Sequence, residues 1–337
     1  MIEMLWVDKY QPHFLDEIIG QKELVQAFKR YVEIGFIPNL TLGGSPGVGK
    51  TQIIKCFAHD LELIDWDEKG EMYSLQAGQF HLMNASDSRG IDMVRTTLKG
   101  LAQQPTNGMP RLIVLDEGDE ITKDAQAAMR GLIQECSSNT RFILTGNYPE
   151  EFLEAINSRC PLRVVPPLTK DDAIEMIKRI QDKEKFTITD DAINLLFSSC
   201  KGDMRLLINR LQDAHIVSNG NIQKNHIPVV EVGLEEVRKI IEIALTNFEQ
   251  AREIFIALYH TKKDTSQILQ KLYEASYFVP LTQNPENNEI MQRKLRDRIA
   301  ETDFRLQQGT NSIIQLDALL NYIRLLKFIP LKCEKEK

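Results

Sequence analysis

A glycine-rich stretch near the start of the chain decides the fold, because it matches the phosphate-binding pattern G-x-x-x-x-G-K-[ST] in full. Its eight residues are Gly44, Ser45, Pro46, Gly47, Val48, Gly49, Lys50 and Thr51. Glycines in such a loop let backbone N–H groups turn toward phosphate oxygens, and the helix that follows adds its dipole. The pattern assigns Lys50 to the β- and γ-phosphates and Thr51 to Mg²⁺. The sequence therefore predicts a site for ATP and Mg²⁺.

The residues around this loop have the pattern of a parallel α/β sheet. Residues 39–43 are a short strand candidate that runs into the loop, and residues 50–61 are a helix candidate. Residues 111–115 and 140–145 are continuous apolar runs, as expected of buried parallel strands. Strands that alternate with helices predict a parallel sheet with helices on both faces.

Two carboxylates end the strand candidate that begins at Arg111. An apolar strand would deliver Asp116 and Glu117 to the carboxyl edge of the sheet, beside the phosphate loop. Asp116 would bind Mg²⁺, directly or through water, and Glu117 would orient and polarise the attacking water. An ordinary acidic strand end is the alternative, and the phosphate loop upstream argues against it.

The bulk composition is that of a soluble globular protein. The chain has 337 residues, a formal net charge of -7 and five cysteines, none in a Cys-x-x-Cys pair. The charge argues against a surface that coats nucleic acid throughout, yet it permits a local basic groove. Neither a secretory signal nor an apolar run of membrane-spanning length is present. We expect an intracellular protein with no membrane contact, which would be nuclear in a eukaryote and otherwise cytoplasmic or at a viral replication site.

Three zones differ in their pattern. Residues 1–165 alternate strand-like and helix-like stretches, residues 166–228 are helical, and residues 229–337 are helical without a chemical motif. In the middle zone Thr169 is a candidate N-cap, and so is Thr189. The helix candidates there are residues 170–182, the stretch that ends at Cys200, and residues 204–218.

Further motifs are more specific than the phosphate loop. They are LWVDKYQPHFLDEIIGQ at 5–21, NASDSRGID at 84–92, SRC at 158–160, GDMRLLINRLQ at 202–212 and AETDFRLQQG at 300–309. In this order, and over nearly the whole chain, they resemble the clamp-loader small subunits of the replication factor C family. The resemblance implies an AAA+ ATPase module, in which a RecA-like parallel sheet carries a helical lid, followed by an all-α collar domain.

The resemblance also implies partners. Such subunits assemble into a pentameric spiral, in which ATP lets the complex open a ring-shaped sliding clamp and grip primer–template DNA. Hydrolysis then releases the clamp closed around the duplex. On the boundaries above, the ATPase domain would span 1–165, the lid 166–228 and the collar 229–337.

By the same resemblance, Asn147 is the first sensor and Arg205 the second, while Arg159 is an arginine finger that acts in trans on a neighbouring subunit. Without the resemblance, Asn147 would be a turn residue and the two arginines solvated charges. The adenine pocket would be lined by Val7, Tyr10 and Ile19, for which plain core packing is the alternative.

For DNA, the best candidate is Arg89, just before Gly90, because clamp loaders grip duplexes mainly by their phosphates. Arg130 and Lys123 are weaker candidates, and a surface charge is the alternative for all three. Residues 98–109 would face the clamp by resemblance alone.

The chain departs from the family pattern in several places. Gln11 replaces an arginine and Gly118 replaces an alanine, while residues 62–81 form a longer and more acidic stretch than expected. Two other functions remain open at this point. One is another AAA+ DNA motor such as a branch-migration helicase, and the other is a scaffold subunit that binds ATP without hydrolysing it.

Overall fold

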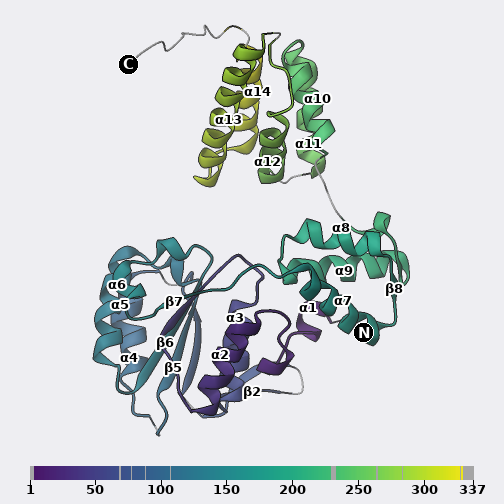
Figure 1. Cartoon of the computed structure of the whole chain (residues 1–337). Coiled ribbons are helices and arrows are strands. Elements are labelled where there is room, and N and C mark those ends of the chain that lie inside the picture. Colours follow the sequence, from purple (N-terminus) through teal and green to yellow (C-terminus); the bar gives the residue numbers. More distant parts are fainter. Residues whose placement is uncertain are drawn as a thin grey trace. The chain divides into compact units, whose positions relative to one another are not determined.

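The chain divides into two compact units, Met1–Pro228 and Val229–Lys337. The computed structural model describes residues 4–67, 70–76, 78–87, 89–106, 108–228, 233–262, 265–282, 284–326 and 328. The first unit contains a β-sheet with helices packed against it, and the second unit is helical (Figure 1). The helices expected at 166–228 group with the sheet in the first unit, so a separate domain boundary at residue 165 stays a prediction.

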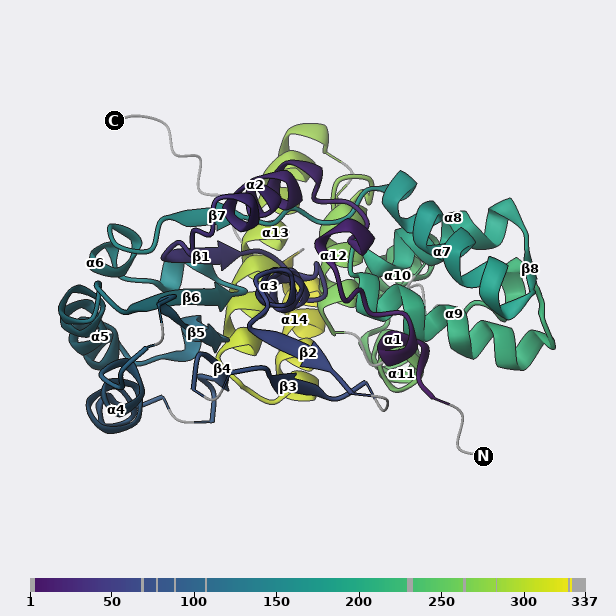
Figure 2. The same ribbon diagram turned by 90° about the horizontal axis from the view of Figure 1, so that it is seen from below.

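Five parallel strands form the sheet of the first unit, in the order β4-β5-β6-β1-β7, which can be followed in Figure 2. They are β1 (Leu40–Gly43), β4 (Phe80–Asn84), β5 (Arg111–Asp116), β6 (Thr140–Gly146) and β7 (Leu162–Val164). The expectation of a parallel sheet is confirmed. Strand β4 follows an irregular stretch and was not expected from the sequence.

Helices cover both faces of this sheet (Figure 1). On one face lie α2 (Lys22–Glu33) and α3 (Lys50–Asp60), and on the other α4 (Lys99–Ala102), α5 (Lys123–Glu135) and α6 (Glu154–Asn157). Strand β5 serves both layers, since Leu112 and Val114 join the core under α2 and α3 while Ile113 and Leu115 join the core under α5. This alternation buries the strand on both sides and fixes its register.

Short elements complete the sheet region. A β-hairpin of β2 (Ile64–Trp66) and β3 (Met72–Ser74) occupies part of the acidic stretch for which the sequence offered no account. The remaining short pieces are α1 (Trp6–Lys9), a π-helical segment (Met93–Leu98) and 3₁₀ turns at Leu15–Glu17, Gly118–Glu120, Pro149–Glu151 and Lys224–His226.

Three helices form the lid region, which also contains the short parallel pair β8 (Thr187–Ile188) and β9 (Asn221–Ile222). They are α7 (Lys170–Glu184), α8 (Asp190–Cys200) and α9 (Met204–Ser218). Thr169 caps α7 in a capping box with Asp172, and Thr189 caps α8, as expected. Each cap satisfies an otherwise free N–H group of the first turn, so the helix starts are set by local sequence.

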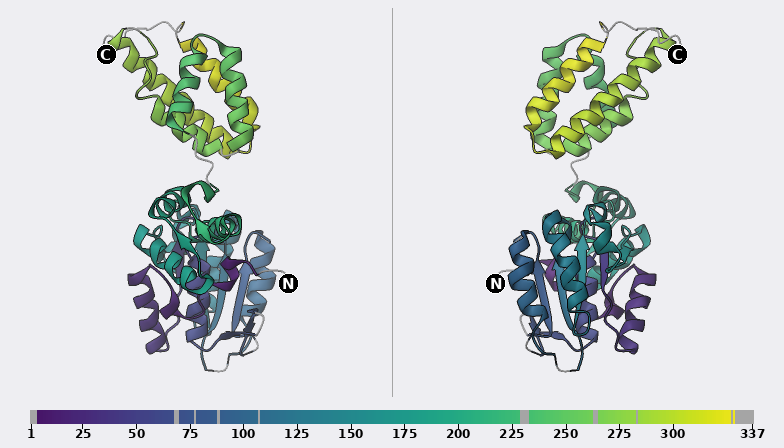
Figure 3. Two further views of the ribbon diagram at one scale, coloured as in Figure 1. Left: turned by 90° about the vertical axis from the view of Figure 1, so that its right-hand side faces the viewer. Right: turned by 90° about the vertical axis from the view of Figure 1, so that its left-hand side faces the viewer.

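The second unit is helical wherever the structure describes it (Figure 3). Its helices are α10 (Leu234–Ala244), α11 (Phe248–Lys262), α12 (Thr265–Ala275), α13 (Pro285–Gln307) and α14 (Ser312–Leu326), and they share one apolar core. Across the described residues, every helix is too short or too polar to cross a bilayer.

Candidate nucleotide site

The phosphate loop joins the end of β1 to the start of α3. Gly47 and Gly49 both have positive φ, 72° and 94°, which glycine adopts without steric cost. Gly49 is also the N-cap of α3, so the loop delivers its backbone to a helix N-terminus. A Cβ atom at Gly47 would lie 1.8 Å from Oδ1 of Asp203, so a larger residue would clash there as well. The loop has the open N–H groups and the dipole that a phosphate chain requires.

Lys50 is held at the centre of the site. Its amine donates hydrogen bonds to the carbonyl oxygens of Gly44 and Ser45, at 2.6 and 2.9 Å, and to Oδ1 of Asn147 at 2.8 Å. Burial lowers the pKa of Lys50, and the nearby charge of Arg205 lowers it further, against the raising effect of carboxylates such as Asp116. An anion beside this amine would raise its pKa again, because a negative charge favours the protonated form.

Oxygen ligands for a metal lie next to this lysine. The Thr51 hydroxyl is 2.8 and 3.0 Å from the two carboxylate oxygens of Asp116, at the end of β5. A hydroxyl and a carboxylate held together beside a phosphate site are the oxygen donors that Mg²⁺ prefers. The residues present therefore fit Mg²⁺ bound together with nucleotide phosphates.

Asn147 is fixed by its backbone as well as by its side chain. The backbone N–H groups of Asn147 and Tyr148 both donate to Oδ2 of Asp119, at 2.9 Å each. Asp119 thus anchors the turn after β6, and the side chain of Asn147 is left to reach Lys50. Sequence reasoning placed Asn147 at the site but assigned no role to Asp119.

A cavity of about 470 Å³ extends from the phosphate loop between the sheet and the lid. This is within the range of small-molecule sites. Val7, Tyr10 and Ile19 line it together with most of the phosphate loop, and so do Asp116, Glu117, Asn147 and Arg205. That the first three contact adenine stays a prediction. Sequence reasoning missed several apolar lining residues from the N-terminal segment and the lid, namely Pro12, Ile18, Leu168, Met176 and Ile208.

The lid meets the phosphate loop directly. Asp203 caps α9 by accepting from the backbone N–H of Leu206 at 2.8 Å, and the N–H of Met204 donates to the carbonyl oxygen of Gly47 at 3.1 Å. Helix α9 therefore begins against the loop, and this start brings Arg205 to the cavity. A positive side chain from the lid and the amine of Lys50 thus converge where phosphate would lie.

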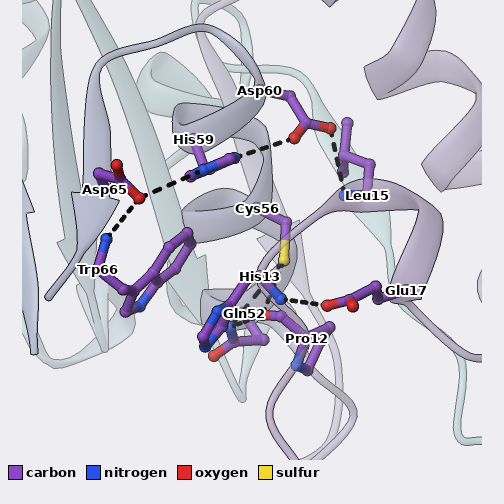
Figure 4. A network of polar contacts seen from close by, with 10 residues as sticks. All are labelled: Pro12, His13, Leu15, Glu17, Gln52, Cys56, His59, Asp60, Asp65 and Trp66. Atoms are coloured by element: carbon purple, nitrogen blue, oxygen red, sulfur yellow. Dashed lines mark hydrogen bonds and ion pairs between the residues drawn. The ribbon is translucent and has the colours of Figure 1, made fainter. Parts of the chain in front are cut away.

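The segment that leads from α1 to the first 3₁₀ turn forms the other wall. The carbonyl oxygen of Pro12 accepts from Gln52 at 2.5 Å and from the thiol of Cys56 at 3.2 Å, both on α3. His13 stacks on Trp66 of the hairpin, with ring centres 4.4 Å apart and planes within 5° (Figure 4). The hairpin therefore supports this segment through Trp66.

The same segment is tied to the lid. Glu184, the last residue of α7, accepts from the Tyr10 hydroxyl at 2.5 Å and pairs with Lys9 at 2.6 Å. Burial, together with the hydrogen bond to Glu184, raises the pKa of Tyr10. Its phenol therefore stays protonated and remains a donor at physiological pH.

Arg159 lies apart from the cavity of its own chain. Its guanidinium donates to the carbonyl oxygen of Ala155 at 3.2 Å, to the Ser158 hydroxyl at 3.1 Å and to the side chain of Gln134 at 3.2 Å. Arg159 is not among the described residues that line the nucleotide cavity.

The DNA candidates are also surface residues. Arg89 forms an ion pair of 2.9 Å with Glu120, in which both side chains are about half exposed. Lys123 pairs with Glu151 at 2.7 Å, and Arg130 is exposed.

The parallel sheet, the phosphate loop and the lid define a P-loop ATPase of the AAA class. The model of the ATPase family associated with various cellular activities (AAA) matches residues 40–168, and that of the replication factor C C-terminal domain matches residues 234–321. Curated relatives called replication factor C small subunit are similar over almost their full length. The protein of Staphylothermus marinus is 36% identical over 94% of this chain and 94% of its own, and that of Methanococcus vannielii is 36% identical over 96% and 99%. The chain belongs to the replication factor C small subunit family.

Solved structures add a likeness of fold. The RuvB Holliday junction branch migration motor of Thermotoga maritima aligns with a TM-score of 0.51 and 20% identity over 79% of this chain and 89% of that one. A point variant of the same motor aligns with a TM-score of 0.52, at the same identity and coverage. At this identity the likeness supports the AAA fold and carries no functional argument.

Proposed function

We propose that this chain is an Mg²⁺-dependent, ATP-hydrolysing small subunit of a clamp loader, which helps to open a sliding clamp and load it onto primer–template DNA. One observation carries the proposal. In a chain of the replication factor C small subunit family, Lys50 is hydrogen-bonded to Asn147, and Thr51 is hydrogen-bonded to Asp116. All four residues line one cavity at the carboxyl end of the sheet.

The chemistry follows from that group. Phosphate oxygens would replace the carbonyl partners of the Lys50 amine, which is already aimed at the loop. Mg²⁺, held through Thr51 and Asp116, would offset the negative charge of the phosphates. Glu117 would accept a hydrogen bond from the attacking water and orient it in line with the γ-phosphate.

The sensors would couple hydrolysis to the shape of the module. Asn147 would bind the γ-phosphate or the attacking water, and Arg205 would draw the lid onto the phosphates. The hydrogen bonds of Arg159 to Ala155 and Gln134 lie outside its own cavity, which supports an action on the ATP of an adjacent subunit. Such an arrangement needs an assembly with other clamp-loader subunits, and the helical second unit would supply its collar.

Contacts with the clamp and with DNA would lie on the α4 side of the sheet. Arg89 would bind a DNA phosphate there, in exchange for its exposed pair with Glu120. The proposed clamp-facing stretch is residues 98–109, of which residue 107 lies outside the described residues. Arg111 supports this stretch through its backbone carbonyl groups. This buried guanidinium donates to the carbonyl oxygens of Leu101 and Gln104, at 2.6 and 3.0 Å.

A single-turnover ATPase assay tests this function, with and without primer–template DNA and clamp. A clamp-loader subunit in its complex should hydrolyse ATP faster when both are present. Hydrolysis with unaided DNA unwinding would instead indicate a branch-migration type of motor. ATP binding without hydrolysis under every condition would indicate a scaffold subunit.

A further inference from the structure

One buried hydroxyl joins the two acidic residues at the end of β5. Oγ1 of Thr145, on β6, donates a hydrogen bond to Oδ1 of Asp116 and accepts one from the backbone N–H of Glu117, at 3.2 Å. Thr145 is only 1% exposed. We propose that Thr145 is a positioning residue for ATP hydrolysis, which fixes Asp116 and Glu117 relative to each other. The inference rests on the roles proposed above for these two residues.

The chemistry of the three groups allows only one arrangement of protons. An ionised carboxylate can only accept a hydrogen bond, and a backbone N–H can only donate one, whereas a hydroxyl has one proton and two lone pairs. The Thr145 hydroxyl must therefore donate its proton to the carboxylate of Asp116 and accept the backbone N–H of Glu117 with a lone pair. Valine has nearly the same shape but can do neither, and serine can do both.

The backbone at this point needs such support. The β5–β6 ladder ends at the pair Leu115 and Leu144, one residue before Asp116 and Thr145. Glu117 then adopts the left-handed conformation, with φ 55° and ψ 38°. For a residue other than glycine this conformation is unfavourable, so surrounding contacts must hold it in place. The side chain of Thr145 continues the link between the strands where the ladder stops.

This link bears on hydrolysis more than on ATP binding. The nucleotide would be held by the phosphate loop and Lys50, whose amine bonds to Gly44, Ser45 and Asn147. Thr145 lines the same cavity, but its hydroxyl is engaged by Asp116 and Glu117. The geometry of Asp116 and Glu117, by contrast, decides where the attacking water and the metal ligand lie. A misplacement of about 1 Å in such groups can lower a rate by about 10²-fold.

Three variants in the assembled complex test the inference, with the ATP sites of the other subunits inactivated so that only this chain turns over. Thr145→Val should lower the single-turnover rate of ATP hydrolysis by about 10²-fold with little change in the Kd for ATP. Thr145→Ser should restore hydrolysis nearly to the wild-type rate. If Thr145→Val does not assemble, Thr145→Ala takes its place, because it also removes the hydroxyl and has a smaller side chain. It should show the same loss of hydrolysis with little change in the Kd for ATP.

Thr140→Val is the matched control. Thr140 lies on the same strand, is fully buried and donates from its hydroxyl to the carbonyl oxygen of Ala102 at 3.0 Å, at the end of β6 far from the phosphate loop. Loss of this hydroxyl should lower the melting temperature of the protein without lowering the single-turnover rate of ATP hydrolysis. Equal losses of hydrolysis in Thr140→Val and Thr145→Val would reduce Thr145 to a stabilising residue and overturn the inference.

Glu117→Gln separates the inference from the function on which it rests. If Glu117→Gln abolishes turnover while Thr145→Val hydrolyses ATP at the wild-type rate, the inference alone is wrong. If Glu117→Gln itself turns over normally, the role proposed for Glu117 is wrong and the positioning role of Thr145 is overturned with it.

Discussion

The amine of Lys50 lies 2.8 Å from the side-chain oxygen of Asn147, although the two residues are 97 positions apart in the sequence. Lys50 opens α3 and Asn147 follows β6, so the contact spans the neighbouring strands β1 and β6. It joins the residue that the phosphate-loop motif identifies to the residue that only the family resemblance singled out. A phosphate that enters the loop must therefore meet both.

Lys50→Ala should lose most ATP binding while the fold survives, because Lys50 is the cation that the motif places on the phosphates. Fluorescence titration with a nucleotide analogue measures the first effect, and circular dichroism the second. An ATP affinity like that of the wild type would contradict the assignment.

The same lysine makes ATP binding dependent on pH. Burial lowers the pKa of Lys50 in the free protein, so its amine loses a proton at a lower pH than an exposed lysine does. Binding a polyanion favours the protonated amine and should be accompanied by proton uptake as the pH rises through this lowered pKa. ATP affinity, measured by titration at a series of pH values, should then fall as the pH rises through this range. An affinity that does not change over the range would contradict the prediction.

Tyr10→Phe tests whether the hydrogen bond between Tyr10 and the lid helps to shape the nucleotide cavity. The substitution keeps the ring in the cavity and removes only the hydroxyl that donates to Glu184. A hydrogen bond of this kind contributes about 1 kcal/mol, which corresponds to roughly a fivefold rise in the Kd for ATP. Isothermal titration would measure it. An unchanged Kd would show that the wall stands without its link to α7.

Arg89→Ala should weaken DNA binding by a similar factor for all sequences, with a salt dependence reduced by about one unit for the lost phosphate contact. Glu120→Gln should have the opposite effect, because it frees Arg89 from its ion pair. Exposed pairs of this kind are weak, so the gain should be small. Salt titrations identical to the wild type in both variants would make Arg89 a bystander.

Arg159→Ala should leave ATP binding in its own subunit intact and depress hydrolysis in the adjacent one. A guanidinium at the γ-phosphate neutralises charge that develops in the transition state, and such fingers contribute about 10³–10⁵ in rate. The measurement is the ATPase activity of complexes in which one subunit carries the substitution. Arg163→Ala, at an exposed arginine on β7, is the control. A defect confined to the mutated subunit's own site would refute the action in trans.

Much of the fold could be predicted because its signals are local. The phosphate-loop motif predicts the strand before it, β1, and the helix after it, α3, and the apolar runs predict β5 and β6. Thr169 and Thr189 mark the starts of α7 and α8 through hydrogen bonds within the first turn. Strand β4 and the β2–β3 hairpin were missed. Trp66 packs against the rings of His13 and His59, and no pattern within its own segment encodes those contacts.

The site divides in the same way. Motif residues such as Lys50 and Asp116 line one cavity, while the roles that the motifs assign to them stay predictions. Thr145 was not singled out, because a threonine within an apolar run reads as ordinary strand. Its two hydrogen bonds reach a neighbouring strand and exist only after the sheet has formed. Asp119 was missed as an anchor for the same reason, since its partners lie 28 and 29 residues away.

The most direct test of the central claim is the ATP-dependent transfer of sliding clamps onto primed circular DNA by the complex that contains this chain. We predict that the wild-type complex transfers clamps and releases them. The complex with Glu117→Gln should bind ATP, clamp and DNA but hold the clamp without release, because hydrolysis is the step that frees it. Clamp release by the Glu117→Gln complex at the wild-type rate, or transfer that is equally fast when this chain is left out, would contradict the account.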